Sequence, residues 1–436
     1  MNERSAFFYG WIIVGMAAVT MTLVYGVRHS FSVFFPSILN QFGWSRGSTA
    51  IMLSIHIFAY GALAPIAGML GDRWRPRVLM PIGIIILGSA AAACGLANEL
   101  WHFYLIFGIC APLGLCFCGW PLLAPALSNW FSTRKGLALG IGNLGGGLSF
   151  AYGIFVEHAI SEFGWRLAYV AVGGSLIAIL LPLSLLVFRY HPAEKGLEPY
   201  GGDSFSRRSP GGIPQPHAED PGWTLREAMR TYQFWLLILS QFFFWGIGCY
   251  LILAHQVKFA EDAGFSGMFA ASIFALYGIL MAVGQVSSAV SDWIGRERTV
   301  ILAGILTVIA LISLVSVTDP SHSWLLYVYA IGFGLGSGLF SPTIFVGAAD
   351  IFHGPQFGVI SGFILTGMGV GGAIGPWLGG YIFDITGTYR IAFWFSILCI
   401  VLSCIAFLIV APKNADAINR KRSAARCATL SAKLYH

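Results

Sequence analysis

Twelve apolar stretches, each long enough to cross a lipid bilayer as a helix, limit most strongly what this chain can fold into. A transmembrane helix needs about 20 mostly apolar residues, because the hydrocarbon core is about 30 Å thick and each residue rises about 1.5 Å. Backbone amides cannot stay unpaired in hydrocarbon, so these stretches must be helical and pack as a bundle. The predicted spans are 8–36, 50–70, 78–96, 102–127, 137–158, 167–188, 234–257, 268–290, 300–317, 324–348, 358–383 and 391–410.

The composition agrees with a membrane protein. The chain is 57% hydrophobic and 10% charged, whereas a soluble domain is roughly a quarter charged. Its net charge of +6 comes from basic residues in the segments between spans, so the lipid bilayer and not nucleic acid is the expected partner. Seven of the eight cysteines lie inside apolar segments and are expected to pack as small hydrophobes. We therefore expect no metal site and no cofactor.

The distribution of Lys and Arg predicts the orientation. If the N-terminus lies in the cytoplasm, inner segments hold 20 of the 25 basic residues and outer loops hold four. Cytoplasmic loops are the basic ones, so both termini are predicted to be cytoplasmic in a multi-pass protein of the cell membrane, an inner membrane if the cell has two. The remaining basic residue, Arg28, lies inside the first predicted span.

A loop pattern occurs twice and suggests two similar halves. Residues 68–77 place a glycine four positions before an aspartate and follow it with arginines, and residues 288–298 repeat this spacing with a serine. Each copy lies where one apolar span ends and the next begins. An aspartate there can cap a facing helix and pair with arginine, so we predict a gate at these loops. The predicted gating residues are Asp72, Arg73, Arg77, Asp292 and Arg296.

Further repeats support the same division. The stretch 164–169 matches 388–393, and Trp120-Pro121 matches Ser341-Pro342. Between the halves lies a polar segment rich in proline and glycine, which is typical of a linker. Two six-helix halves made of repeats are the architecture of a secondary transporter. The predicted organisation is a six-helix half at 1–188, a cytoplasmic linker at 189–232, a second half at 233–411 and a cytoplasmic tail at 412–436.

At these residues the chain resembles the major facilitator superfamily, through the 68–77 loop and the two-half pattern. Within it, the chain resembles the monocarboxylate-porter group and its bacterial relatives. The segments that carry this resemblance are 8–11, 25–36, 42–46 and 163–166. The resemblance implies an all-α fold of twelve transmembrane helices. It also implies transport of lactate, pyruvate, oxalate, formate or similar acids, with a proton or by exchange.

The chain departs from that group at two places. Animal members carry an acidic and a basic residue one turn apart in helix eight, but residues 277–285 carry neither charge. Helix eleven, 358–383, also lacks the basic residue of some oxalate exchangers. A second substrate class therefore stays open, a neutral planar molecule such as a riboflavin-like vitamin or a drug.

Arg28 is the strongest candidate for an anchor of substrate. A charge inside a span costs a few kcal/mol and is functional by default. His29 follows it, and His56 lies at a similar depth in the second span, so the three could form one basic cluster. All Asp and Glu fall in loops, tails or span ends, so a coupled proton would have to use His29 or His56 or travel on the substrate. Further candidate binding residues are Trp120, Asn143, Trp245, Tyr250, Tyr277, Gln285 and Ser341.

The predicted function is secondary active transport of small organic anions by rocker-switch alternating access, as symport or antiport. No nucleophile–base or metal constellation accompanies the spans, so an enzyme is not expected. A membrane sensor would need an added soluble domain, and the tail is too short for one. The expected partners are a small-molecule substrate and the bilayer, with a monomer as the expected assembly.

Overall fold

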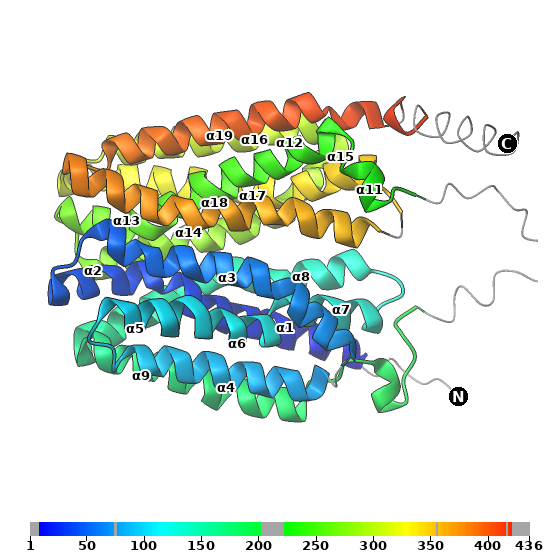
Figure 1. The fold of residues 1–436 in the computed structure, drawn as a ribbon, viewed down its shortest axis with the longest axis horizontal. Helices are drawn as coiled ribbons and strands as arrows, with labels where there is room; N and C mark the ends of the chain where they lie inside the picture. Colours follow the sequence, from blue (N-terminus) through cyan, green and yellow to red (C-terminus); the bar gives the residue numbers. More distant parts are fainter. Residues whose placement is uncertain (1–7, 74–75, 202–221, 355, 416, 421–436) are drawn as a thin grey trace, which may run out of the picture.

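The computed structural model describes residues 8–73, 76–201, 222–354, 356–415 and 417–420, most of which are helical (Figure 1). In this part of the chain, eleven helical segments are long and apolar enough to cross a membrane, and one of them, 136–186, has 51 residues. Such a helix would be more than twice as long as the bilayer core is thick. It is broken at Gly164, whose φ of 75° and ψ of 160° suit glycine. The segment thus holds two spans, and the predicted twelve-helix fold is confirmed.

The helices form two six-helix halves that lie side by side as two layers in Figure 1. The N-terminal half contains α1 (Tyr9–His29), α2 (Phe31–Phe42), α3 (Arg46–Arg73), α4 (Pro76–Cys94), α5 (Leu100–Leu105), η1 (Ile106–Cys110), α6 (Ala111–Cys118), α7 (Trp120–Trp130), α8 (Lys135–Leu148), η2 (Ser149–Ala151) and α9 (Tyr152–Leu186). Short pieces such as α1 and α2 follow each other within one span, because the first candidate span runs unbroken over Tyr9–Phe42.

The C-terminal half repeats this arrangement. It contains α12 (Tyr232–Gln241), η4 (Phe242–Cys249), α13 (Tyr250–Asp262), α14 (Gly267–Ser287), η5 (Ser288–Val290), α15 (Ser291–Ile294), α16 (Arg296–Val315), η6 (Pro320–His322), α17 (Trp324–Ile351), α18 (Phe357–Thr386), α19 (Arg390–Val410) and η7 (Pro412–Asn414). Two short helices, η3 (Pro192–Lys195) and α11 (Leu225–Ala228), lie between the halves in the sequence.

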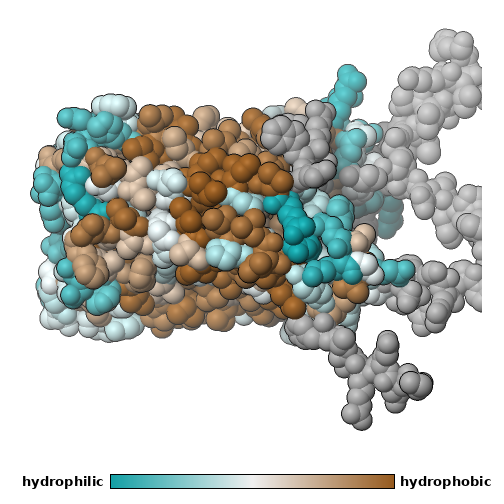
Figure 2. Space-filling view, turned by 90° about the horizontal axis from the view of Figure 1, so that it is seen from below, coloured by the Kyte–Doolittle hydropathy of each residue, from teal (hydrophilic) through white to brown (hydrophobic). Residues whose placement is uncertain are grey.

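Figure 2 shows an apolar band around the middle of the molecule, with polar residues at both ends. Many large apolar side chains on the outside are exposed, including Phe58, Ile179 and Ile309. Exposing these apolar side chains to water would cost free energy, whereas exposing them to lipid tails does not. The surface therefore fits a protein whose sides face the bilayer.

In lipid the hydrophobic effect does not drive helices together, so they depend on close van der Waals packing, which glycines allow. A Cβ on Gly246 in η4 would lie 2.6 Å from the Cα of Gly371 in α18, so these two backbones touch inside the C-terminal half. Between the halves, a Cβ on Gly380 of α18 would lie 2.6 Å from the backbone of Arg46 in α3. Close packing thus operates both within and between the halves.

Hydrogen bonds between the halves, among the described residues, occur in the middle of the bundle and at one of its ends. We call this end the sealed end, formed by residues 42–46, 258–266 and 384–390, and the opposite end, near α11 and α15 in Figure 1, the terminal end. All such bonds between the halves involve Arg28, Ser32, Arg46, Gly47 or Ser54 of the N-terminal half. If the termini are cytoplasmic as predicted, the sealed end is the outer one.

Candidate functional site

Arg28 is a buried cation at the seam between the halves. Only 4% of it is exposed, and its Nη2 donates a hydrogen bond to the hydroxyl of Tyr250 in the other half. Its guanidinium carbon lies 5.1 Å from the ring centre of Tyr25, 5.3 Å from that of Tyr60 and 5.5 Å from that of Tyr250. Three tyrosine rings therefore surround the charge, and cation–π attraction partly replaces the water it has lost.

The charge of Arg28 is nevertheless incompletely satisfied. Its Nε and Nη1 are buried and have no hydrogen-bond partner among the described residues, and it forms no ion pair there. An unpaired buried charge costs several kcal/mol, which the tyrosine rings and one hydroxyl offset only in part. Each of these donors forms a fork with Nη2, so a carboxylate that displaces the Tyr250 hydroxyl from Nη2 could accept two parallel N–H bonds.

His56 supplies an acceptor near these donors. It lies four residues before Tyr60 on α3, hence on the same helix face, and it is fully buried. Its Nδ1 lies 2.8 Å from the carbonyl oxygen of Phe107, which can only accept, so Nδ1 carries the hydrogen. Nε2 then presents a lone pair, and it has no partner among the described residues. It can accept a proton or a hydroxyl hydrogen of a ligand.

Trp245 adds one more unused donor. Its ring centre lies 6.3 Å from that of Tyr250, and its Nε1 is buried without a partner in the described part of the chain. Trp245 lies within η4, a π-helical segment that runs into α13 at Tyr250. Such segments place side chains off the regular helical register and often occur at functional sites. The predicted residues Arg28, His56, Trp245 and Tyr250 are thus gathered in one region.

His29 and Tyr277 lie around Phe150, beside the Arg28 group, and the ring of His29 also stacks on that of Tyr25 at 5.9 Å. The ring of His29 stacks on Phe150 at 3.8 Å, and its Nδ1 lies 2.7 Å from the hydroxyl of Ser149. Tyr277 is fully buried, packs edge-on against Phe150 at 4.9 Å and contacts the sulfur of Met281. Both side chains therefore have packed, hydrogen-bonded positions, and neither contacts the guanidinium of Arg28.

The remaining candidates do not join the Arg28 group in this conformation. Trp120 begins α7 and lies beside Gly142 of α8, one residue from Asn143. Gln285 and Ser341 lie in α14 and α17, toward the terminal end, and both are half-buried. Among the described residues, no hydrogen bond or ring contact joins these four side chains to Arg28, so their role in binding stays a prediction.

The predicted gating residues lie at the terminal end. Arg296 contacts Asp292 at 2.5 Å and Asp350 at 3.0 Å, all within the C-terminal half. Arg77 is exposed in the first turn of α4. Asp72 and Arg73 end α3, and their side chains lie outside the described part of the structure. A gate between the halves at this end stays a prediction.

Sequence reasoning missed Tyr25 and Tyr60, whose hydroxyls are 2.9 Å apart and whose rings flank Arg28. Tyr25 is three residues before Arg28 and Tyr60 four after His56, so helical spacing alone could have found both. It also missed Arg46, which was counted as a loop charge but contacts the other half at the sealed end.

Twelve spans in two halves, with a buried cation where the halves meet, are the architecture of a membrane transporter. The family model of the Major Facilitator Superfamily matches residues 14–352 and 288–433 in two overlapping stretches. The chain belongs to the Major Facilitator Superfamily.

Similar proteins agree with this assignment. Human monocarboxylate transporter 11 is 26% identical over 89% of this chain and 80% of its own length. Rat monocarboxylate transporter 13 is 27% identical over 88% of this chain and 85% of its own. A crystal structure of a bacterial homologue of the human lysosomal transporter Spinster, inward-facing and unoccupied, shares the fold with a TM-score of 0.67 at 17% identity. The structural match covers 93% of this chain and 96% of the Spinster homologue. The predicted transporter class, rather than an enzyme, is therefore confirmed.

Proposed function

We propose that this protein transports small organic anions with one carboxylate, and that Arg28 binds that carboxylate. The observation that carries the proposal is the pair of buried, unused N–H donors on Arg28 at the seam of the two halves. A carboxylate that takes Nη2 together with Nε or Nη1 would give that donor a partner and neutralise the charge. The similarity to monocarboxylate transporters supports the same substrate class.

The contact between Arg28 and Tyr250 gives this site its link to alternating access. Arg28 belongs to the first span and Tyr250 to the seventh, so their hydrogen bond joins the halves. A bound carboxylate competes with the Tyr250 hydroxyl for the guanidinium. Substrate binding would thereby change a contact between the halves, as a rocker-switch cycle requires.

The proposal is tested by measuring ligand-induced stabilisation of the purified protein and uptake into liposomes. The panel holds short monocarboxylates, dicarboxylates, riboflavin and neutral aromatics. A ligand that binds the folded state raises the melting temperature by mass action. We expect stabilisation by a monocarboxylate and a loss of affinity of about 10- to 100-fold in Arg28→Met, since charge-assisted hydrogen bonds contribute about 1.5–3 kcal/mol.

Arg28→Met also separates binding from folding. Removing an unpaired buried charge in favour of an apolar chain of similar volume is often neutral or stabilising. The ligand-free variant should therefore melt at or above the wild-type temperature. Arg390→Gln, which removes an exposed arginine, is the matched control and should keep wild-type binding. Stabilisation by riboflavin or a neutral aromatic alone, equal in wild type and Arg28→Met, would contradict the proposal.

Proton coupling and exchange predict different behaviour of His56. In symport, the lone pair of Nε2 is the acceptor proposed to take the proton, so His56→Gln should abolish uptake driven by a pH gradient. Exchange of labelled for unlabelled substrate should survive. In obligatory exchange, a pH gradient should drive no uptake in either protein.

A further inference from the structure

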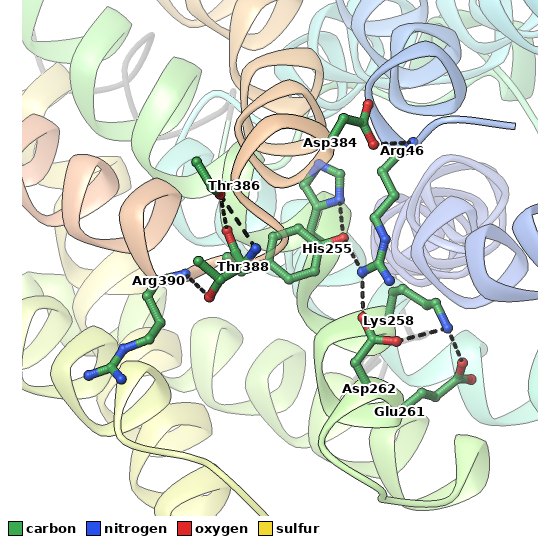
Figure 3. Close-up of polar contacts among 10 residues, drawn as sticks. Arg46, His255, Lys258, Glu261, Asp262, Asp384, Thr386, Thr388 and Arg390 are labelled. Carbon is green, nitrogen blue, oxygen red and sulfur yellow. Dashed lines mark hydrogen bonds and ion pairs between the residues drawn. The ribbon is translucent and has the colours of Figure 1, made fainter.

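The sealed end is held by one arginine of the N-terminal half. Arg46 forms an ion pair with Asp262 of α13, and its Nη1 lies 2.9 Å from the hydroxyl of Tyr389 (Figure 3). Its guanidinium carbon lies 3.6 Å from the ring centre of Phe383. The backbone N–H of Arg46 and that of the next residue donate to the carboxylate of Asp384, at 2.9 and 2.8 Å. Every one of these partners belongs to the C-terminal half.

A chain of hydrogen bonds runs from Arg46 through Tyr389 to His255, and the donor and acceptor of each bond can be assigned. His255 is fully buried, and its Nε2 lies 2.7 Å from the carbonyl oxygen of Pro376, so Nε2 must carry the hydrogen. In the neutral ring, Nδ1 then accepts from the Tyr389 hydroxyl, 3.2 Å away. Burial raises the pKa of Tyr389, which keeps its hydroxyl protonated and able to donate. Arg46 donates to Tyr389, and both ring nitrogens of His255 are in use.

Two carboxylates face each other across the same seam. Glu157 lies in α9 of the N-terminal half and Glu261 in α13 of the C-terminal half. Their Oε1 atoms lie 2.3 and 3.4 Å from the position that a Cβ on Gly267 would take. The two oxygens can therefore be no further apart than the sum of these distances. Both side chains are only partly exposed, so water screens their repulsion incompletely.

In the described part of the chain, neither Glu157 nor Glu261 has a cation that pairs with it alone. Glu157 forms no ion pair among the described residues, and Lys258 lies 3.8 Å from Glu261 but only 3.1 Å from Asp262. The described charged groups that meet in these contacts at the sealed end are two cations, Arg46 and Lys258, and four carboxylates. These are Glu157, Glu261, Asp262 and Asp384. Closing this end thus gathers an excess of two negative charges.

The other titratable groups nearby do not balance this excess. His158 adjoins Glu157 but is exposed on α9. Arg390 begins α19, and its side chain points away from the cluster in Figure 3. Helices α2 and α14, which pack against α9 and α13, contribute no Asp, Glu, Lys, Arg or His. The charge of the seam therefore depends on how many of its carboxylates hold a proton.

We propose that the sealed end is a pH-responsive latch, in which Arg46 holds the halves together and repulsion between Glu157 and Glu261 loosens them when both are ionised. Acid on this side removes the repulsion and favours the sealed state, whereas alkaline solution favours opening. With the predicted orientation, the latch would respond to the pH outside the cell. The latch requires no particular substrate at Arg28, so the two proposals stand or fall separately.

The test measures the distance between two spin labels across the sealed end. Labels at Leu96→Cys and Ser316→Cys, both exposed in loops at that end, are placed in the full chain without its native cysteines. The protein is studied in lipid nanodiscs without substrate, at about pH 5 and about pH 8, a window that brackets partly buried carboxylates. We expect the ratio of sealed to open molecules to be about tenfold higher in acid.

Five variants decide the outcome. Glu157→Gln and Glu261→Gln should each stay sealed at both pH values and lose the response. Glu162→Gln, which removes an exposed carboxylate of the same helix, should respond as the wild type does. Arg46→Gln should favour the open state at both pH values, while Arg390→Gln should not. An unchanged pH response in both Glu157→Gln and Glu261→Gln would overturn the proposal, as would a wild-type distance that does not change with pH.

Discussion

Arginine–aspartate contacts occur at both ends of the molecule, but they join different parts. At the sealed end, Arg46 of the N-terminal half contacts Asp262 and Asp384 of the C-terminal half. At the terminal end, Arg296 contacts Asp292 and Asp350, which belong to its own half. The same pair of residue types therefore bridges the halves at one end and braces a single half at the other.

This difference determines what each contact can do. A contact between the halves exists in one conformation and is lost when that end opens, so its free energy shifts the balance of states. A contact inside one half persists through a rigid-body movement and contributes to stability alone. Variants at the sealed end should change the ratio of states, and variants at the terminal end should change the melting temperature.

The largest shift is expected from Gly380→Ala. A Cβ there would lie 2.6 Å from three backbone atoms of Arg46 and Gly47, so α3 and α18 must separate in the sealed state. Overpacking of this kind costs about 1–3 kcal/mol, which lowers the ratio of sealed to open molecules about 5- to 150-fold. The gain in helix propensity from glycine to alanine occurs in both states and cancels. Spin-label distances across the sealed end measure the ratio.

Gly358→Ala is the matched control for this prediction. It changes the same helix, α18, at a position where a new Cβ has no atom within 4 Å. Its ratio of states should equal that of the wild type. If Gly358→Ala shifted the ratio as far as Gly380→Ala does, close packing between the halves would not be the cause.

A smaller shift is expected from Asp384→Ala. The carboxylate of Asp384 accepts from the first backbone N–H groups of α3 and so caps a helix of the other half. Loss of a helix cap costs about 1 kcal/mol, which corresponds to a ratio about fivefold lower. Asp384→Asn keeps an acceptor oxygen, so its ratio of sealed to open molecules should fall less than that of Asp384→Ala. Equal effects of the two variants on the spin-label distances would show that the charge, and not the cap, is what counts.

The fold could be predicted from the sequence because the bilayer imposes a simple rule of length and polarity on every span. Arg28 could be predicted because a charge in an apolar stretch is conspicuous, and Tyr250, one of the further candidate binding residues, contacts it in the structure. The bend at Gly164, which separates two spans, followed from the same rule, since no single helix of that length fits a bilayer.

The rest of the site depends on contacts between spans, which no local pattern encodes. Tyr25 and Tyr60 flank Arg28 only because the first and second spans pack face to face there. Arg46 lies in a short polar stretch, where a count of loop charges predicts orientation but cannot show that the loop meets the other half. His29 was grouped with Arg28 because it follows it in the sequence, yet neighbouring residues on a helix point in different directions, and the ring of His29 stacks on Phe150.

The smallest effect is expected from Arg296→Gln, which tests the terminal end. Its partner Asp292 has a side chain that is 63% exposed, so solvent weakens the pair, and such contacts contribute about 0–1 kcal/mol. The melting temperature should fall slightly, and a double-mutant cycle with Asp350→Asn should show coupling of similar size. The spin-label distances at the sealed end should not change. A shift of the sealed ratio as large as that of Asp384→Ala would mean that Arg296 also contacts the N-terminal half in another conformation, as the predicted gate at this end requires.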